Sequence, residues 1–500
     1  MTDIAKRPKL MQKIIAYTDS KEACLLFPST EAAEGCKAFA TSPARGDGTL
    51  SDDQITIRAF TIADVNVYGV FVPPTSMPTI SAFWTHAGVG ISSRFAEHCL
   101  AHIDKLREVQ LDLPQPPTQD SHSHVLVNER IAGLLNRAPA DPQRTAKVSP
   151  DDVYLFQTGM SAIYWVHRYL LSKHNSSSVL FGFAFHSTIH VLGDFGPGVE
   201  FFGHGTDGDL QKLEPFLAAR AEEGKPVQAI WTEFPSNPLL VTPDLKGLRK
   251  LADQYGALLI VDDTIGSFCD VDVLGVADIV LTSLTKSFSG YADVMAASAV
   301  LSPLSARYSE LKVLFNTSYR NDFFAGDAEA LEKNSRNYLE RSGVMNNNAA
   351  KLVEYLQTEA ENPASPVKKV YYPTVDDTLA KYRDFMRPQT SEFAPGYGCL
   401  FSVEFESEET TIAFYDNLHV HQGPHLGAHL TLALAYTMGV YGKELEWAAQ
   451  YNMRPEQIRI SVGLEDTQNL LADFRIAVEA AKKCAEAVDL TNGGFAVQAA

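Results

Sequence analysis

Basic residues, cysteines and long apolar segments are all scarce in this sequence, and each shortage excludes a class of protein. The 500 residues include 42 lysines and arginines against 61 aspartates and glutamates, which gives a formal net charge of −19. Such a surface repels nucleic acid and anionic lipid, so neither is expected as a partner. No apolar segment approaches the ~18 residues that a membrane-spanning helix needs, so no membrane span is expected.

Cysteines are few and scattered, and none belongs to a C-x-x-C pair. In a chain of this length that pattern is typical of reduced thiols in the cytosol, and no disulfide is needed. The basic segment MTDIAKRPKLMQK has no apolar core after it, so it is not expected to act as a signal peptide. We therefore expect a cytoplasmic protein. The six cysteines are Cys24, Cys36, Cys99, Cys269, Cys399 and Cys484.

From about residue 150 the sequence has the pattern of an α/β domain. Short, almost continuously apolar segments alternate with amphipathic ones, which indicates a largely parallel sheet covered by helices. Between two of these segments the spacing predicts a helix that Thr242 caps, with Pro243 in its first turn and Gly256 at its end. The predicted strands are residues 152–156, 178–185, 228–234, 257–263 and 278–285.

The rest of the chain divides around this α/β region. We expect an N-terminal extension over residues 1–150, a large domain over 151–320, a smaller α+β domain over 321–490 and a frayed tail over 491–500. The smaller domain is expected to begin with one long helical segment, AEALEKNSRNYLERSGVMNNNAAKLVEYLQ, followed by strand-like segments. The Pro-rich segment at 111–124 predicts a loop or linker.

Ligands of parallel sheets bind beyond the carboxyl ends of the strands, so residues at those ends are the first candidates for a site. Four predicted strands place Phe185, Glu233, Asp262 and Lys286 on one such rim. Lys286 ends an otherwise apolar segment, LTSLTK. That position is costly for a lysine unless its ammonium group is paired or its pKa is altered.

The chemistry of these residues suits pyridoxal 5′-phosphate (PLP). A helix that opens at Gly159 and Met160 offers backbone N–H groups to a phosphate, and Ser283 and Thr285 add hydroxyl groups. A lysine beside the phosphate can form a Schiff base. An aspartate at the opposite side can keep a pyridinium nitrogen protonated, which makes the ring an electron sink.

Several segments resemble the Cys/Met-metabolism PLP-dependent enzymes, the cystathionine γ-synthase family. WTEFPSNP, VDDT and SLTKSFSGYADV are similar to the family's E-x-P-x-NP, VDNTF and S-x-TK-x-x-x-GHSDV segments, and FQTGMSAIYW is similar to its SSGM-A segment. CLLFPSTEAAEGCKAF and FWTHAGVGISSRFAEHCL look like fungal cystathionine γ-synthases. The match covers roughly residues 20–490. It implies PLP fold type I (aspartate aminotransferase-like), an α/β fold with a central, mostly parallel, seven-stranded sheet and a smaller C-terminal α+β domain.

The resemblance also implies roles for matched residues. Lys286 would be the Schiff-base lysine and the general acid/base, and Asp262 would pair with the pyridine nitrogen. Arg459, in QIRISVG, would bind the substrate α-carboxylate, and His425 would lie beside that substrate. Arg94 would reach the phosphate of the neighbouring subunit, so residues 1–150 would include an arm to that site. The implied cofactor-binding residues are Gly159, Met160, Phe185, Asn237, Asp262, Ser283, Thr285, Lys286 and Arg94.

The reaction implied is γ-substitution on an O-acylated homoserine, with cysteine as nucleophile and a vinylglycine-type intermediate. Four departures bear on it. Phe185 stands where the family usually has a tyrosine, and His425 where it has a serine. Ser92-Ser93-Arg94 stands where bacterial members have YSR, and GYADV at 290–294 where they have GHSDV. The alternatives are a carbon or other nucleophile in secondary metabolism, a γ- or β-lyase, and a non-catalytic PLP-binding protein. Small-molecule amino acids are the expected substrates, and a homodimer or homotetramer with shared active sites is the expected assembly.

The segment HVHQGPHLGAH contains four histidines at metal-like spacing. His419 and His421 could share a strand face, and His425 and His429 a helix face. Because no cysteine or carboxylate is adjacent, a pocket or surface role is favoured, and no metal is expected. The segment HAGVG lacks the third glycine of a dinucleotide-binding fingerprint.

Overall fold

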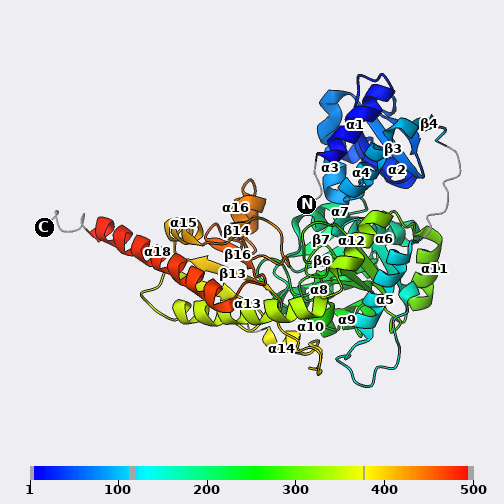
Figure 1. Cartoon of the computed structure of the whole chain (residues 1–500). Helices are drawn as coiled ribbons and strands as arrows, with labels where there is room; N and C mark the ends of the chain where they lie inside the picture. Colours follow the sequence, from blue (N-terminus) through cyan, green and yellow to red (C-terminus); the bar gives the residue numbers. More distant parts are fainter. Residues whose placement is uncertain (1–4, 112–119, 376–377, 494–500) are drawn as a thin grey trace.

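A computed structural model describes residues 5–111, 120–375 and 378–493 of the chain (Figure 1). Its framework consists of three sheets of four, seven and five strands, which follow one another along the sequence. Within those ranges, the search for a helix both long and apolar enough to span a membrane finds none. Parts of two predictions fall outside the description: residues 112–119 of the linker and residues 494–500 of the tail.

The central sheet has the order β5-β11-β10-β9-β8-β6-β7. Only β11 runs antiparallel to its two neighbours, so the predicted fold class, a mostly parallel seven-stranded α/β sheet, is confirmed. Its strands are β5 (Val153–Phe156), β6 (Ser178–Phe181), β7 (Val199–Phe202), β8 (Ala229–Glu233), β9 (Leu258–Asp262), β10 (Ile279–Thr282) and β11 (Ala297–Leu301).

Helices cover both faces of this sheet, which explains why its strands are apolar throughout. Side chains alternate between faces along a strand. Trp231 and Ile260 pack with α6 and α7, whereas Ile230 and Val261 pack with α5, α8 and α9. The covering helices are α5 (His122–Asn136), α6 (Gly159–His174), α7 (His186–Asp194), α8 (Asp207–Glu222), α9 (Leu245–Tyr255), α10 (Ser267–Asp270), α11 (Tyr308–Ser318) and α12 (Ala325–Asn334).

The N-terminal region forms an antiparallel sheet of its own, in the order β1-β3-β2-β4. Its helices were not anticipated from the sequence; the first buries only Leu10 and Ile14, which is a weak amphipathic signal. The strands are β1 (Ala23–Phe27), β2 (Thr56–Ile62), β3 (Val65–Val72) and β4 (Arg107–Val109). The helices are α1 (Lys6–Tyr17), α2 (Thr30–Ala40), α3 (Met77–Ala87) and α4 (Ser93–Ala101).

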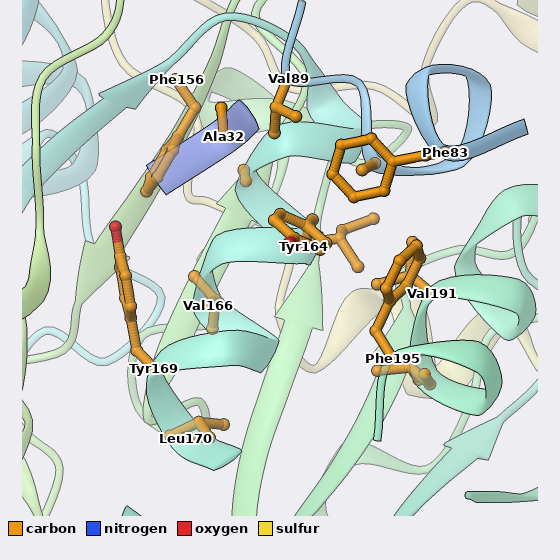
Figure 2. Close-up of a cluster of buried hydrophobic side chains, with 14 of the residues drawn as sticks. Ala32, Phe83, Val89, Phe156, Tyr164, Val166, Tyr169, Leu170, Val191 and Phe195 are labelled. Atoms are coloured by element: carbon orange, nitrogen blue, oxygen red, sulfur yellow. The ribbon is translucent and has the colours of Figure 1, made fainter. Parts of the chain in front are cut away.

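An aromatic cluster joins this N-terminal region to the central sheet (Figure 2). Phe83, on α3, is fully buried. Its ring centroid lies 5.6 Å from that of Tyr164 on α6 and 5.7 Å from that of Phe195, which follows α7. Tilted and edge-on pairs at these separations are favourable beyond the area they bury. The cluster therefore fixes the N-terminal region against the helix that opens the candidate site.

The third sheet has the order β12-β13-β16-β15-β14. Its strands are β12 (Val367–Tyr371), β13 (Leu400–Phe405), β14 (His421–Gln422), β15 (Leu432–Leu434) and β16 (Gln457–Ser461). The accompanying helices are α13 (Tyr338–Ala360), α14 (Leu379–Arg383), α15 (Glu408–Asn417), α16 (Tyr436–Tyr441), α17 (Leu445–Ala449) and α18 (Thr467–Gly493).

The structure corrects several local predictions. The strand expected over residues 178–185 ends at Phe181, so Phe185 lies in the loop before α7. The helix expected to start at Thr242 begins later, because Asp244 is its cap and accepts the backbone N–H of Gly247. The single helical segment expected after residue 320 is two helices, α12 and α13, interrupted at residues 335–337. The strand expected to reach residue 285 ends at Thr282, so Lys286 lies in the turn beyond β10. The domain boundaries themselves stay a prediction.

We expect Phe83→Ala to destabilise the protein strongly. Truncation of a buried phenylalanine loses transfer free energy and leaves a cavity, at a typical cost of about 3–5 kcal/mol. The urea concentration at the unfolding midpoint should fall accordingly. Val313→Ala is the control, because that side chain is 65% exposed. Equal midpoints for Phe83→Ala and the wild type would contradict the packing described.

Candidate active site

A cavity of about 280 Å³ opens at the carboxyl ends of β8, β9 and β10. It brings together residues from α6, from the ends of β8 and β9 and the loops that follow β6, β8, β9 and β10, and from β16 of the third sheet. Nine of the site residues expected from the sequence line it, while His425 and Arg94 do not. The nine are Gly159, Met160, Phe185, Asn237, Asp262, Ser283, Thr285, Lys286 and Arg459.

One end of the cavity is the first turn of α6. Thr158 caps this helix: its hydroxyl accepts the N–H of Ser161 at 2.9 Å and donates to the carbonyl of Gly88 at 3.1 Å. A Cβ on Gly159 would lie 3.3 Å from Ser283, so the helix start and the Lys286 loop approach closely. Unpaired N–H groups at a helix start, with a serine hydroxyl opposite, are suited to an anion such as a phosphate.

The hydroxyl of Thr285, which was expected to bind a phosphate, forms hydrogen bonds with the backbone. Its hydroxyl donates to the carbonyl of Ala296 and accepts the N–H of the same residue at 3.0 Å. These bonds fasten the segment before Lys286 to the start of β11. Thr264, which the sequence did not single out, also lines the cavity and accepts the N–H of Ser283 at 2.8 Å.

The cavity also contains Lys286 and Asp262. Burial, together with the positive charge of Arg459, lowers the pKa of Lys286 to about 8, although Asp262 opposes the shift. Burial raises the pKa of Asp262, against the effects of Thr264 and of the Lys286 charge. The carboxyl accepts the N–H of Thr264 at 2.9 Å. A lysine with a pKa near neutrality is a competent nucleophile and proton acceptor.

Arg459 reaches the cavity from β16 and is held in place on several sides. It donates to Asn237 Oδ1 at 3.2 Å and to the carbonyl of Pro424. Its guanidinium lies 4.6 Å above the ring of Tyr436, whose hydroxyl accepts from Asn237 Nδ2 at 3.2 Å. Only 4% of Arg459 is exposed, so it is a buried, oriented cation of the kind that binds carboxylates. No sequence pattern pointed to Tyr436, which is separated from Asn237 by 199 residues.

His425 and Arg94 lie outside the lining of the cavity. Burial, followed by the charge of Lys286, lowers the pKa of His425 to about 4, so its imidazole is neutral at neutral pH. Arg94 forms ion pairs with Asp293 at 3.0 Å and Asp327 at 3.2 Å in its own chain. Its expected contact with a neighbouring subunit stays a prediction.

The histidine-rich segment does not form the helix face that its spacing suggested. His421 lies in the two-residue strand β14, and residues 423–431 are irregular, so the expectation of a helix carrying His425 and His429 was wrong. In the described part of the chain, no group of three or more histidine, cysteine, aspartate or glutamate residues is arranged to hold a metal ion.

The turn that carries Lys286 is stabilised from below by Arg341 on α13. Arg341 is 2% exposed, and it donates to the carbonyls of Ser287 and Phe288, each at 2.9 Å. Gly290 closes the turn: its N–H donates to the carbonyl of Lys286 at 2.8 Å, and its φ is +74°. A Cβ at Gly290 would overlap the Arg341 guanidinium.

The donors in this cavity fit PLP. The first turn of α6 and Ser283 offer an anion cradle, in which a Cβ on Gly159 would lie only 3.3 Å from Ser283. Asp262 offers a carboxylate to a ring nitrogen, and Lys286 offers an amine. Phe185 offers a ring face that is 44% exposed. Phosphate, pyridine nitrogen, aldehyde carbon and aromatic ring thus each have a chemical counterpart.

Two known family models match this chain, and together they cover most of its length. Residues 146–479 match the model described as Cys/Met metabolism PLP-dependent enzyme. Residues 8–92 match the model described as fungal trans-sulfuration enzyme, N-terminal domain. The second match coincides with most of the N-terminal sheet and its helices.

Curated relatives are similar over most of their length. The cystathionine gamma-synthase-like enzyme iboG1 of Amanita muscaria is 35% identical, with 96% of this chain and 90% of that protein covered. The alanine racemase ungC of Aspergillus violaceofuscus is 37% identical, with 83% and 74% covered. The cystathionine gamma-synthase of Neurospora crassa is 32% identical, with 94% and 88% covered.

Solved structures support the fold. A cystathionine gamma synthase from Xanthomonas oryzae pv. oryzae, in complex with aminoacrylate and cysteine, superposes with a TM-score of 0.59. The sequence identity is 24%, and the match covers 73% of this chain and 87% of that one. At this identity the likeness establishes the fold alone.

We expect Gly290→Ala to weaken PLP binding. The new methyl group must displace Arg341, which removes charge-assisted hydrogen bonds of about 1.5–3 kcal/mol each from the Lys286 turn. The dissociation constant, measured by titration of the full-length apoprotein with PLP, should rise about tenfold or more, since tenfold corresponds to about 1.4 kcal/mol. The matched control is Gly224→Ala, where φ is +68° and no atom lies within 4 Å of the new Cβ. Equal effects of the two substitutions would show that backbone strain, rather than Arg341, is responsible.

Proposed function

The chain belongs to the Cys/Met metabolism PLP-dependent enzyme family, and we propose that it catalyses γ-substitution on an O-acylated homoserine with cysteine as the nucleophile. It is a cystathionine gamma-synthase-like enzyme with PLP as its cofactor. The observation that carries the proposal is the single cavity that contains Lys286, Asp262 and Arg459. Together these residues offer an amine, a carboxylate and a carboxylate-binding guanidinium.

Lys286 attaches the cofactor and moves the protons in this scheme. Its Nζ removes the proton from the substrate Cα and then one from Cβ, and it returns a proton when the product forms. A pKa of about 8 suits this task, because an amine with a pKa near the working pH both accepts and releases protons readily. When bound, PLP supplies an electron sink for the negative charge that develops at the substrate carbons. Asp262 maintains the protonated ring nitrogen on which that property depends.

Arg459 binds the substrate α-carboxylate and so fixes the position of Cα. Its contacts with Asn237, Pro424 and Tyr436 hold the guanidinium in one orientation before the substrate arrives. His425, the other residue proposed to lie beside the substrate, is uncharged at neutral pH and contributes no competing positive charge. The proposed cofactor-binding residues are Gly159, Met160, Phe185, Asn237, Asp262, Ser283, Thr285 and Lys286, together with Arg94 across a subunit interface.

A second candidate differs only in the nucleophile. Among the described residues that line the cavity, Lys286 and Arg459 are the cations, and both already have assignments. The carboxylate of cysteine therefore finds no further cation among the described residues that line the cavity. Apolar side chains occupy much of the remaining lining: Met160, Ile163, Ile265, Met295 and Leu426. This lining favours a carbon or sulfur nucleophile that has no carboxylate.

We further propose a cytoplasmic homodimer or homotetramer with shared sites, in which residues 1–150 supply an arm to the neighbouring subunit. Residues 151–320 would form the cofactor-binding domain, and residues 321–490 the smaller domain. Small-molecule amino acids are the partners that the family supports.

We expect the purified protein, supplied with PLP, O-acetylhomoserine or O-succinylhomoserine, and cysteine, to form cystathionine. Mass spectrometry of the products separates this result from the alternatives. Consumption of the ester with transfer to methanethiol or a carbon acid, but not to cysteine, would select the second candidate. Release of a keto acid and ammonia alone would identify a lyase.

Arg459→Lys serves as the diagnostic variant. Loss of the planar guanidinium removes a charged hydrogen bond worth about 1.5–3 kcal/mol, so KM for the ester should rise about 10- to 100-fold with a smaller change in kcat. Lys286→Ala should be inactive. An unchanged KM in Arg459→Lys would remove Arg459 from the substrate site.

A further inference from the structure

Glu233 is a half-buried ionisable group to which the reaction scheme gives no task. It is the last residue of β8, and it pairs in register with Asp262, the last residue of β9. Neighbouring strands lie about 4.8 Å apart, and paired residues of parallel strands point to the same side. Both carboxyl groups line the cofactor cavity. Two acidic side chains therefore lie next to each other at the end of the cavity where a ring nitrogen is expected.

Glu233 also holds the backbone of another residue of the site. Its Oε1 accepts the N–H of Phe185 at 2.7 Å. Phe185 presents the exposed ring face of the cavity and precedes α7 directly. The position of that ring therefore depends on a bond from β8 to the loop that follows β6. The other carboxyl oxygen, Oε2, is buried and has no hydrogen-bond partner among the described residues.

Two adjacent buried carboxyl groups do not both ionise, because each charge destabilises the other. Burial and then the charge of Asp262 raise the pKa of Glu233 to about 8, while N–H groups of Phe185 and Asn237 oppose the shift. Asp262 is better placed to keep a charge, because it accepts the N–H of Thr264 and the cation Lys286 favours its ionised form. An ionised Glu233 would instead leave Oε2 bare in the interior, which is costly.

The other titratable groups near Glu233 and Asp262 do not change which of the two carboxyl groups carries the charge. Tyr436 and Tyr441, on α16, feel the Glu233 charge, and burial raises the pKa of both phenols, so both are neutral. Arg459, on β16, interacts with Asn237 and Pro424 rather than with Glu233. Lys286 acts on Asp262.

We propose that Glu233 is a positioning residue. As an uncharged carboxylic acid it anchors the backbone of Phe185 beside the cofactor ring, and it leaves the single negative charge of the pair on Asp262. The inference rests on the proposed assignments of Asp262 and Phe185, but it is independent of the nucleophile.

The decisive variant is Glu233→Gln, which keeps the shape and an acceptor oxygen for Phe185 but cannot ionise. The dissociation constant for PLP is measured by quenching of tryptophan fluorescence during titration of the full-length apoprotein, between pH 6.5 and 9.5. Below the pKa of Glu233, about 8, the wild-type carboxyl is neutral, so the wild-type and Gln values should agree within about threefold. Above that pH the wild-type carboxyl ionises and the two curves should separate.

Glu233→Ala removes the acceptor for Phe185 and should raise the dissociation constant about tenfold at pH 7, from the loss of one hydrogen bond to a carboxyl group. It is compared only if its circular dichroism matches that of the wild type. Glu444→Gln is the matched control. The Glu444 carboxylate lies 3.2 Å from His186, the residue that follows Phe185, but Glu444 does not line the cavity. It should match the wild type at every pH.

If Glu233→Gln binds PLP at pH 7 as poorly as Glu233→Ala does, Glu233 works as an anion and the inference is overturned. Coincidence of the wild-type and Gln curves over the whole pH range, with weaker binding by Glu233→Ala, would show that the uncharged form works throughout and would support the inference. Lys286→Ala and Asp262→Asn are titrated in parallel. Wild-type affinity in both of these would refute the site assignment itself, whereas weakened affinity in both confines any failure to the Glu233 inference.

Discussion

The burial of the Lys286 amine among fixed charges is the constraint on which the rest of the site depends. An isolated buried ammonium is costly, and the protein reduces that cost by lowering the pKa of Lys286 and by placing Asp262 on the adjacent strand end. The same arrangement sets the charge state of its neighbours. Arg459 lowers the pKa of the lysine, and Lys286 in turn helps to keep His425 neutral. A ligand that carries a phosphate and an aldehyde would add a negative charge and a reaction partner for the amine of Lys286.

The surrounding fold keeps these charges in register. Parallel strands deliver Glu233 and Asp262 to one edge, and Arg341 and Gly290 hold the turn that presents Lys286. The N-terminal region contributes through Gly88, whose carbonyl accepts from the capping hydroxyl at the start of α6, and through the aromatic cluster around Phe83 (Figure 2). The third sheet contributes Arg459. The central and third sheets therefore both contribute to one cavity, and the N-terminal region supports the helix start beside it. Figure 1 shows by its colours that the three regions follow one another along the chain.

The sequence predicted the elements whose signal is local. Apolar strands such as β8 and β9 can be recognised from their composition alone. Because such strands end at one edge of the sheet, Asp262 and Lys286 could be predicted to lie close together. Contacts that join distant segments were not predictable. Tyr436 beneath Arg459, Thr158 bonded to Gly88, and Arg94 paired with Asp293 and Asp327 have no pattern that names their partners. The cap of α9 was misplaced because threonine and aspartate both cap helices, and only the geometry chooses between Thr242 and Asp244.

The central claim is that one amine, Lys286, carries the cofactor. Reduction of the PLP-loaded protein with borohydride, followed by proteolysis and peptide mass spectrometry, tests it directly. The account predicts one pyridoxyl group, on the peptide that contains Lys286, and its loss in Lys286→Ala. A pyridoxyl group on another lysine, or none at all in the loaded wild-type protein, would contradict the account.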